Sequence, residues 1–232
     1  FVANVSHELR TPLTNVRSYA ETLHDSSDVP PEMANSFLDV ILSETDRMTH
    51  IVQDLLTLSK FDYGHMEMSM SRFPLTDAVD DVCNAVEMAA KSHNHTLIRN
   101  YPTLPVITAD RGRLTQVIMN IVGNAIKYTP DGGRIEISGG ADNDSVWLEV
   151  SDNGLGIPPA DRTHVFERFY RVDKARSRES GGTGLGLSIA SEIIAQHHGV
   201  ISLVERDGPG TTFRITLPIW QEPQEDDHAE EE

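Results

Sequence analysis

The first sixty residues carry two apolar stripes of helical period. In residues 2–24 and 33–58, apolar side chains recur at spacings of three and four, so one face of each segment is apolar. The stretch HDSSDVPPEM between them combines turn residues with helix-start chemistry. Pro12 interrupts the first stripe and predicts a bend close to His7. The stripes are Val2, Val5, Leu9, Leu13, Val16, Ala20 and Leu23, then Met33, Phe37, Val40, Ile41, Glu44, Met48, Ile51, Leu55 and Leu58.

These two helices predict an all-α hairpin that forms a dimeric four-helix bundle. A hairpin of about 60 residues cannot cover its own stripe well, whereas two hairpins can bury it on all sides. We therefore expect a homodimer. From Asp62 onward the pattern changes to short alternating runs that predict strands, with helices between them, and this second part is expected to be α/β. The predicted strands are MEMSMSRF, RIEISGG, SVWLEVSD, GVISLVER and TTFRITLP, and the helices are Leu114–Tyr128 and Leu185–His197.

Charge and composition narrow the function classes. The formal net charge is -17, and seven of the acidic residues lie in the last twelve positions, QEPQEDDHAEEE. So acidic a chain is a poor match for nucleic acid, which requires clustered Lys and Arg. No apolar run approaches the roughly 18 residues that cross a bilayer, so we expect this portion to be soluble. Because the first residue is Phe1 rather than Met, we expect a piece of a longer protein. The lone Cys83 is interpreted as a small buried apolar residue.

Three glycine-containing stretches suggest a phosphate-binding fold of an unusual kind. They are NIVGNAIKY (120–128), DNGLGI (152–157) and GGTGLGL (181–187), the last of which is followed by a helical run. Glycines let backbone N–H groups approach a phosphate, and a helix beginning there adds partial positive charge. A P-loop is excluded because no Gly-Lys pair occurs, and the protein-kinase strings HRD and DFG are absent. Another type of ATP-binding fold is required.

The segment SHELRTP (6–12) has the beginning of a zinc-protease motif without its end. His7 is followed by Glu8, but the residue four positions after the histidine is Thr11, not a second histidine. The pairs His93 and His95, and His197 and His198, also lack suitably spaced Cys or acidic ligands, and we interpret them as lying in solvated turns and at a helix end. His7 therefore needs an explanation other than a metal.

Six stretches together resemble the sensor histidine kinases of two-component signalling. SHELRTPL resembles the family's H-box, NIVGNAIKY its N-box, DNGLGI its G1 box, FERFYRVD its F-box, GGTGLGL its G2 box and GPGTTF its last glycine element, in the family's order over residues 1–219. The resemblance implies a dimerisation and histidine phosphotransfer domain at 1–64. It implies an ATP-binding catalytic domain with the two-layer α/β sandwich of the GHKL (Bergerat) fold at 65–220. Residues 221–232 are expected to be an acidic, disordered tail.

The resemblance also implies a set of nucleotide contacts. Asn124 would place its amide oxygen on Mg2+, with Asn120 one turn earlier and nearer the phosphates of ATP. Lys127 would offset phosphate charge, and Tyr128 would pack on the adenine. Asp152 would accept a hydrogen bond from the adenine amino group, which guanine lacks at that position. The other implied contacts are Gly154 and Gly156 beside the base, Arg168 and Arg171 near the γ-phosphate, and Gly182, Thr183, Gly184, Leu185, Gly186 and Thr211 in the glycine-rich stretches.

Each of these assignments has a simpler alternative. Asn120 and Asn124 would also suit a solvated helix face, the DNG string is often only a turn, and Tyr128 would also fit a core. Arginines on surface loops are common, so the two arginine assignments rest on the resemblance alone. The resemblance further implies that residues 170–184 form a mobile lid over the triphosphate.

With an ATP-binding domain in the same chain, His7 gains a chemical role. Phosphoryl transfer needs an in-line nucleophile, and imidazole, unlike a lysine amine, is largely neutral at neutral pH. Glu8 is the expected general base, and the ring nitrogen facing away from it is the expected nucleophile. Thr11 lies one helical turn further on, where its hydroxyl could hold a water in line with a phosphorus atom, and the resemblance implies that this position serves removal of phosphate from the partner.

These residues, together with the resemblance, imply autophosphorylation of His7 by ATP, followed by transfer to an aspartate on the receiver domain of a response regulator. Phosphatase activity toward that regulator is a further expectation. The whole protein is expected to be a membrane-anchored sensor, with this portion in the cytoplasm. Two alternatives are a clamp-type ATPase, which would need a glutamate where Asn120 stands, and a non-catalytic dimeric module with vestigial boxes.

Overall fold

The chain divides into two units in the computed structural model, which describes residues 2–25, 29–64, 66–172, 182–206 and 208–219. One unit joins residues 1–66 to residues 163–189, and the other joins residues 67–162 to residues 190–232. The predicted domain boundaries stay predictions. The predicted acidic tail and part of the predicted lid, residues 173–181, lie outside the described residues.

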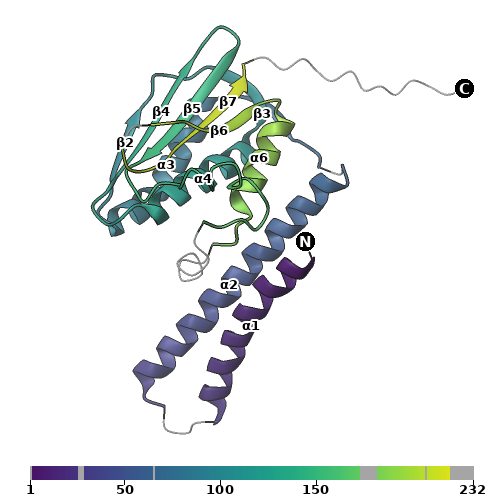
Figure 1. Ribbon diagram of the computed structural model, residues 1–232, viewed down its shortest axis with the longest axis vertical. Helices are drawn as coiled ribbons and strands as arrows, with labels where there is room; N and C mark the ends of the chain where they lie inside the picture. Colours follow the sequence, from purple (N-terminus) through teal and green to yellow (C-terminus); the bar gives the residue numbers. More distant parts are fainter. Residues whose placement is uncertain (1, 26–28, 65, 173–181, 207, 220–232) are drawn as a thin grey trace, which may run out of the picture. The chain divides into compact units, whose positions relative to one another are not determined.

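Two helices form the hairpin that the periodicity predicts. Helix α1 (Val2–Asp25) packs side by side with helix α2 (Pro31–Asp62), as Figure 1 shows. A proline occupies the first turn of α2, where its missing N–H leaves no helical hydrogen bond unmade. Tyr19 of α1 and Phe37 of α2 bring their ring centroids to 5.1 Å. Pro12 lies inside α1 and is buried, and the predicted bend there stays a prediction.

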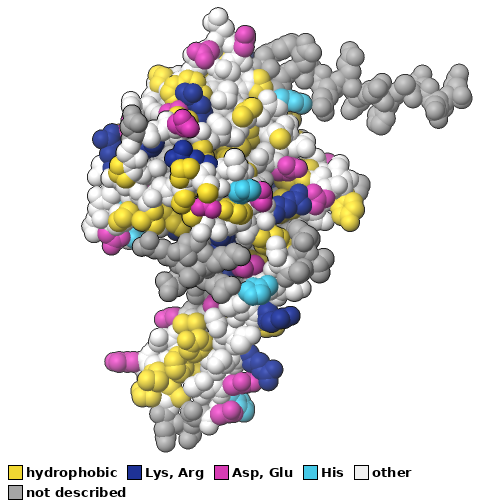
Figure 2. Space-filling model, in the orientation of Figure 1, with side chains coloured by type: hydrophobic (Ala, Val, Ile, Leu, Met, Phe, Trp, Pro, Cys, Tyr) yellow, Lys and Arg dark blue, Asp and Glu magenta, His cyan; other side chains and the backbone are white. Residues whose placement is uncertain are grey.

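Helix α2 carries a second apolar stripe, which stays exposed to solvent in the hairpin. This stripe, which we call the α2 seam, consists of Leu38, Leu42, Val52 and Leu56 of α2. Their exposed fractions are 48%, 63%, 44% and 60%. The sequence pattern did not single them out as a stripe. With Thr45 and Thr49 between them, they follow the 3.5-residue repeat of a coiled-coil contact. Figure 2 shows hydrophobic side chains gathered in a patch over the hairpin.

The second unit is built on a five-stranded sheet with a two-stranded sheet beside it. In the larger sheet the strand order is β2-β4-β5-β7-β6, and the β2–β4 pair is parallel while the other three pairs are antiparallel. β1 pairs antiparallel with β3. The strands are β1 (Met70–Pro74), β2 (Thr96–Asn100), β3 (Val106–Asp110), β4 (Arg134–Ala141), β5 (Ser145–Asp152), β6 (Val200–Leu203) and β7 (Thr212–Pro218).

Helices cover one face of the larger sheet (Figure 1). They are α3 (Leu75–Ser92), α4 (Arg111–Tyr128) and α6 (Gly186–Gln196), the last of which contributes residues to both units. Alternate residues of β5 face the helices, so Val146, Leu148 and Val150 are buried. The apolar layer between helices and sheet includes Leu75, Leu114, Ile118, Val146, Leu148, Ile215 and Leu217. The expected two-layer α/β sandwich is confirmed.

Several elements of this unit differ from the sequence prediction. Helix α3 and strands β2 and β3 were not predicted, and α4 begins at Arg111 rather than Leu114. The earlier start follows from Asp110, whose side chain caps the helix by accepting a hydrogen bond from the backbone N–H of Arg113 at 3.0 Å.

Two of the four histidines that the sequence excluded as metal ligands are buried. His95 is 7% exposed, and its Nε2 lies 3.2 Å and 3.1 Å from the carbonyl oxygens of Thr129 and Pro130. His197 is fully buried: its Nδ1 donates to the Ile193 carbonyl at 2.7 Å, while its Nε2 accepts from the Asp110 N–H at 3.0 Å. The prediction of a solvated turn was therefore wrong for His95, whereas His197 directly follows the last residue of α6, as the predicted helix end requires, and is buried there. Both rings join segments far apart in the sequence.

No helix in the described part of the chain has both the length and the apolar character needed to cross a membrane.

The buried His197 makes the stability of the fold pH-dependent. Burial lowers its pKa below the ordinary value of 6.5, so the unfolded chain binds a proton more readily than the folded one. We predict that His197→Gln lowers the free energy of unfolding by about 1–3 kcal/mol near neutral pH, through the lost hydrogen bonds. The difference between the two proteins should shrink as pH falls below 6.5, because the wild type then loses the contribution of its neutral imidazole. Urea unfolding at several pH values measures it, and a constant difference would contradict the assignment.

Candidate functional site

Helix α1 presents a histidine to solvent with a carboxylate behind it. The His7 side chain is 59% exposed, whereas that of Glu8 is 15% exposed. Nδ1 of His7 lies 4.0 Å from Oε1 of Glu8, close enough for a small rotation to bring them into hydrogen-bonding distance. Thr11 is exposed on the same helix, one turn further on. The three predicted catalytic residues therefore share one stretch of helix, with the imidazole accessible.

The second carboxylate oxygen of Glu8 faces two arginines. Arg47 of α2 brings its Nη2 within 3.2 Å of Oε2, and Arg171 brings its Nη1 within 3.4 Å of the same atom. Both guanidinium side chains are largely buried, at 11% and 5% exposed. Arg171 was predicted from the sequence for a different contact, with the γ-phosphate. Arg47 was not predicted, because it occupies an ordinary polar position of a helix, 39 residues from Glu8.

In the second unit, Asp152 forms the centre of the predicted adenine site. It ends β5 in the phase of the buried residues, which is why a carboxylate comes to be 7% exposed. Its Oδ1 accepts the backbone N–H groups of Gly154 at 2.9 Å and Thr211 at 3.2 Å. Burial raises the pKa of this carboxyl, while the two N–H groups and Arg206 act in the opposite direction. Both of these backbone bonds are thus made to Oδ1 rather than to Oδ2.

The loop that carries Thr211 depends on a glycine. Gly210 has φ of +100°, and a Cβ there would lie 1.8 Å from the carbonyl oxygen of Asp152. Any side chain would therefore push the loop away from the carboxylate that it supports. Gly156 belongs to the same cluster, since a Cβ on it would meet the Gly210 carbonyl oxygen at 3.2 Å. Both Gly210 and Thr211 belong to the GPGTTF string, but only Thr211 was predicted to contact the nucleotide.

Helix α4 carries the four other predicted contacts of this unit. Asn120 and Asn124 are both partly exposed, and their four-residue spacing places them on one face of the helix. At the helix end, Lys127 Nζ lies 5.2 Å from the centre of the Tyr128 ring. The carbonyl oxygen of Tyr128 accepts the Leu155 N–H at 3.3 Å, which joins α4 to the turn after Asp152. The structure thus brings Tyr128, Asp152, Gly154, Gly156 and Thr211 together.

The side-chain amides of Asn120 and Asn124 on α4 suit a hard cation that is coordinated mainly by the phosphates of a bound nucleotide. Amide oxygens are suitable ligands for Mg2+, which keeps several waters and binds phosphate oxygens rather than all-protein cages. Among the residues that the structure describes, no three His, Cys, Asp or Glu side chains gather as metal ligands. One or two amides on an exposed helix face are consistent with that limited role for the protein.

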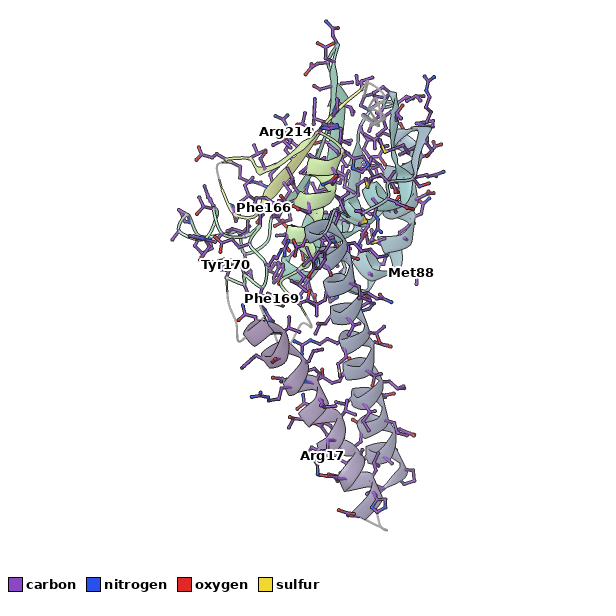
Figure 3. All side chains as sticks on the ribbon, turned by 90° about the vertical axis from the view of Figure 1, so that its right-hand side faces the viewer. Arg17, Met88, Phe166, Phe169, Tyr170 and Arg214 are labelled. Atoms are coloured by element: carbon purple, nitrogen blue, oxygen red, sulfur yellow. The ribbon has the colours of Figure 1, made fainter. Side chains whose placement is uncertain are left out.

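The predicted arginine and glycine contacts of the first unit lie on residues 163–172 and 182–189. Figure 3 labels three aromatic side chains of the first stretch, Phe166, Phe169 and Tyr170. The two stretches meet where the Phe169 N–H donates to the Gly184 carbonyl at 2.9 Å. Gly184 has φ of +71°, and a Cβ there would lie 2.9 Å from the Phe169 backbone. Gly182 and Gly186 flank this contact in sequence, and Leu185 is fully buried.

Two polar contacts attach these stretches to helix α2. Arg168 donates through both terminal nitrogens to Asp62, at 2.7 Å and 2.6 Å, and this lowers the pKa of the aspartate. Thr183 donates to Asp54 at 3.3 Å, although burial raises the pKa of that carboxyl overall. Arg168 thus contacts a carboxylate of the hairpin, and its predicted contact with the γ-phosphate, like that of Arg171, stays a prediction.

Comparisons with known proteins also assign different roles to the two parts of the chain. Residues 1–64 match the model of the His Kinase A (phospho-acceptor) domain, and residues 109–221 match that of the histidine kinase-, DNA gyrase B- and HSP90-like ATPase. The chain is 44% identical over 233 residues to the sensor histidine kinase WalK of Bacillus subtilis (strain 168). That match covers 99% of this chain and 38% of the relative, so the chain spans less than two fifths of its length.

Two solved structures are similar over large parts of the chain. The catalytic domain of histidine kinase ThkA is 30% identical, with a TM-score of 0.59, over 66% of this chain and 99% of that one. The histidine kinase ThkA in complex with the response regulator protein TrrA is 26% identical, with a TM-score of 0.77, over 94% of this chain and 61% of that one. With a phospho-acceptor domain and an ATPase-type domain in the family's order, the chain belongs to the sensor histidine kinases.

Proposed function

We propose that this chain is the catalytic core of a protein-histidine kinase that transfers the γ-phosphoryl group of ATP to His7 and then to an aspartate on a response regulator. The observation that carries the proposal is the exposed imidazole of His7 with Glu8 4.0 Å from its Nδ1, in a chain that also holds the buried Asp152 site. Nucleophile, base and nucleotide site are thus all supplied by one sequence.

In the first proposed transfer, from ATP to His7, one bond to phosphorus forms as another breaks. The lone pair of His7 Nε2 attacks the γ-phosphorus, the bond from that phosphorus to the β,γ-bridging oxygen breaks, and ADP leaves with the electron pair. The ring would then carry a positive charge, which is removed when Nδ1 gives its proton to Glu8. Because Glu8 lies on the Nδ1 side, Nε2 is the nitrogen assigned to the phosphoryl group.

The nucleotide would be held at its two ends by different groups. Asp152 Oδ2 would accept from the adenine amino group, beside Tyr128. Asn120 and Asn124 would face the phosphates, with Asn124 as the protein ligand of Mg2+ and Lys127 offsetting charge. Bound Mg2+ would neutralise phosphate oxygens. A clamp-type ATPase is the weaker candidate, because Asn120 cannot deprotonate the attacking water.

Transfer onward and its reversal extend the same proposal. The response regulator in complex with ThkA is the kind of partner we assign to this chain, with the exposed surface of α1 around His7 as its contact. Thr11 is exposed one turn from His7, where its hydroxyl would position a water for removal of phosphate from that partner. Phosphatase activity is thus proposed for the same stretch of helix.

His7→Gln should abolish phosphorylation of the chain by radiolabelled ATP with Mg2+, because it removes the accepting imidazole. In the wild type the label should disappear on treatment with acid, since the P–N bond of phosphohistidine is acid-labile. His24→Gln is the matched control, because His24 is an exposed histidine of the same helix. Label that survives acid, or that persists in His7→Gln, would contradict the proposal.

Asp152→Asn should weaken ATP binding while leaving the fold intact. The Asn side-chain oxygen can still accept from Gly154 and Thr211, but its NH2 group would replace Oδ2 and face the amino group of adenine. We expect Kd for a non-hydrolysable ATP analogue to rise about 10- to 100-fold, the cost of leaving donors unpaired in a buried site. Calorimetry measures it, with Glu149→Gln on the same strand as control. Equal affinity in wild type and Asp152→Asn would rule out the adenine contact.

The homodimer is proposed from the α2 seam, whose exposed apolar residues follow a coiled-coil repeat. Leu42→Glu should convert a dimer to a monomer, because it would bury a charge in the contact between two hairpins. Light scattering over a range of concentrations measures the mass, with Leu155→Glu, an exposed leucine of the second unit, as control. A monomeric wild type would refute the dimer.

A further inference from the structure

Glu8 has two carboxylate oxygens, and the structure divides them between two tasks. Oε1 is the oxygen nearest His7 Nδ1, at 4.0 Å, whereas Oε2 receives the guanidinium groups of Arg47 and Arg171. We propose that Arg47 is a positioning residue for phosphorylation of His7: it fixes the Glu8 carboxylate so that Oε1 points to the imidazole. This inference rests on the proposed kinase function.

The ion pair between Arg47 and Glu8 is partly buried and therefore differs from a surface ion pair. Exposed ion pairs contribute little, because two flexible side chains must be ordered for a screened attraction. Here the Arg47 and Glu8 side chains are 11% and 15% exposed, so solvent screens them less. They also lie on the two different helices of the hairpin, 39 residues apart, so the pair fixes Glu8 relative to α2 as well as within α1.

Arg47 is itself held in place by two more polar residues. Its Nη1 lies 3.6 Å from Oε2 of Glu44, one turn earlier on α2. The other oxygen of Glu44 accepts a hydrogen bond from the side-chain amide of Asn15 at 2.7 Å, which returns the chain of contacts to α1. The series Asn15, Glu44, Arg47 and Glu8 therefore crosses between the helices twice. Such a network limits the rotamers of its members, which is what a base of fixed orientation requires.

Arg171 adds a third interaction but does not replace Arg47. Its contact with Oε2 is longer, at 3.4 Å, and it comes from a stretch 163 residues further along the chain. Arg47 belongs to the hairpin that carries the histidine, and so its contact is part of the same local structure as His7 and Glu8. The inference therefore concerns Arg47.

The rival explanation is that Arg47 merely stabilises the hairpin. A double-mutant cycle separates the two roles, because a residue that acts through Glu8 has no effect on the rate once Glu8 can no longer accept a proton. The proteins are wild type, Arg47→Ala, Glu8→Gln and the double variant. Arg17→Ala is the matched control, since Arg17 is an exposed arginine of α1 (Figure 3) that pairs with Glu21 within its own helix.

The measurement is the initial rate of His7 phosphorylation at saturating Mg-ATP, together with KM for ATP. We expect Arg47→Ala to lower kcat at least about tenfold, and by no more than the roughly 10²- to 10⁴-fold that a general base contributes, and to leave KM unchanged. In the Glu8→Gln background the same substitution should change kcat less than about twofold. Arg17→Ala should match the wild type. If Arg47→Ala does not fold, as judged by thermal unfolding, Arg47→Gln takes its place in the same cycle.

Two results would overturn the inference. One is a kcat of Arg47→Ala equal to that of the wild type, and the other is an equal loss in both backgrounds, which a purely structural role would produce. A wild type that does not phosphorylate His7 at all would instead refute the proposed function, so the two failures are distinguishable.

Discussion

The ion pair between the partly buried Glu8 carboxylate and Arg47 is the interaction on which the proposed phosphorylation site depends. An imidazole on an exposed helix has no inherent orientation, and the neighbouring glutamate would also be free on an isolated helix. Packing α1 against α2 places Arg47 at 3.2 Å from Glu8, so the hairpin itself gives the carboxylate a fixed direction. The same hairpin leaves the His7 side chain 59% exposed, as the proposed transfer of a phosphoryl group to and from this ring requires.

A comparable constraint organises the second unit. Asp152 is buried because β5 alternates, and a buried carboxylate is tolerated only when it is hydrogen-bonded. The backbone N–H groups of Gly154 and Thr211 meet that need, and the close approach of Gly210 allows the second of these contacts. Both carboxylates are thus partly satisfied by the protein, and the proposed function assigns the other oxygen of each to its partner.

The sequence predicted what depends on local pattern and missed what depends on distant pairing. The period of the apolar residues gave α1 and α2, and the motif strings gave Asp152, Gly154 and Thr211. Helix α3 was missed although Leu75, Val79, Val82 and Val86 have helical spacing, so a closer inspection of the pattern would have found it. Strand β3 was missed because it is only five residues long and is fixed by pairing with β1, which no local pattern shows. The Arg47–Glu8 pair and the buried state of His197 arise only when segments 39 and 87 residues apart are brought together.

The central claim is that one nitrogen of His7 receives the phosphoryl group while Glu8 serves the other. Nuclear magnetic resonance of the chain after reaction with Mg-ATP tests it most directly, because the ring-nitrogen chemical shifts distinguish the two isomers of phosphohistidine. The account predicts a single phosphoryl group, bonded to Nε2 of His7. Phosphate on Nδ1, on another residue, or on none would contradict it.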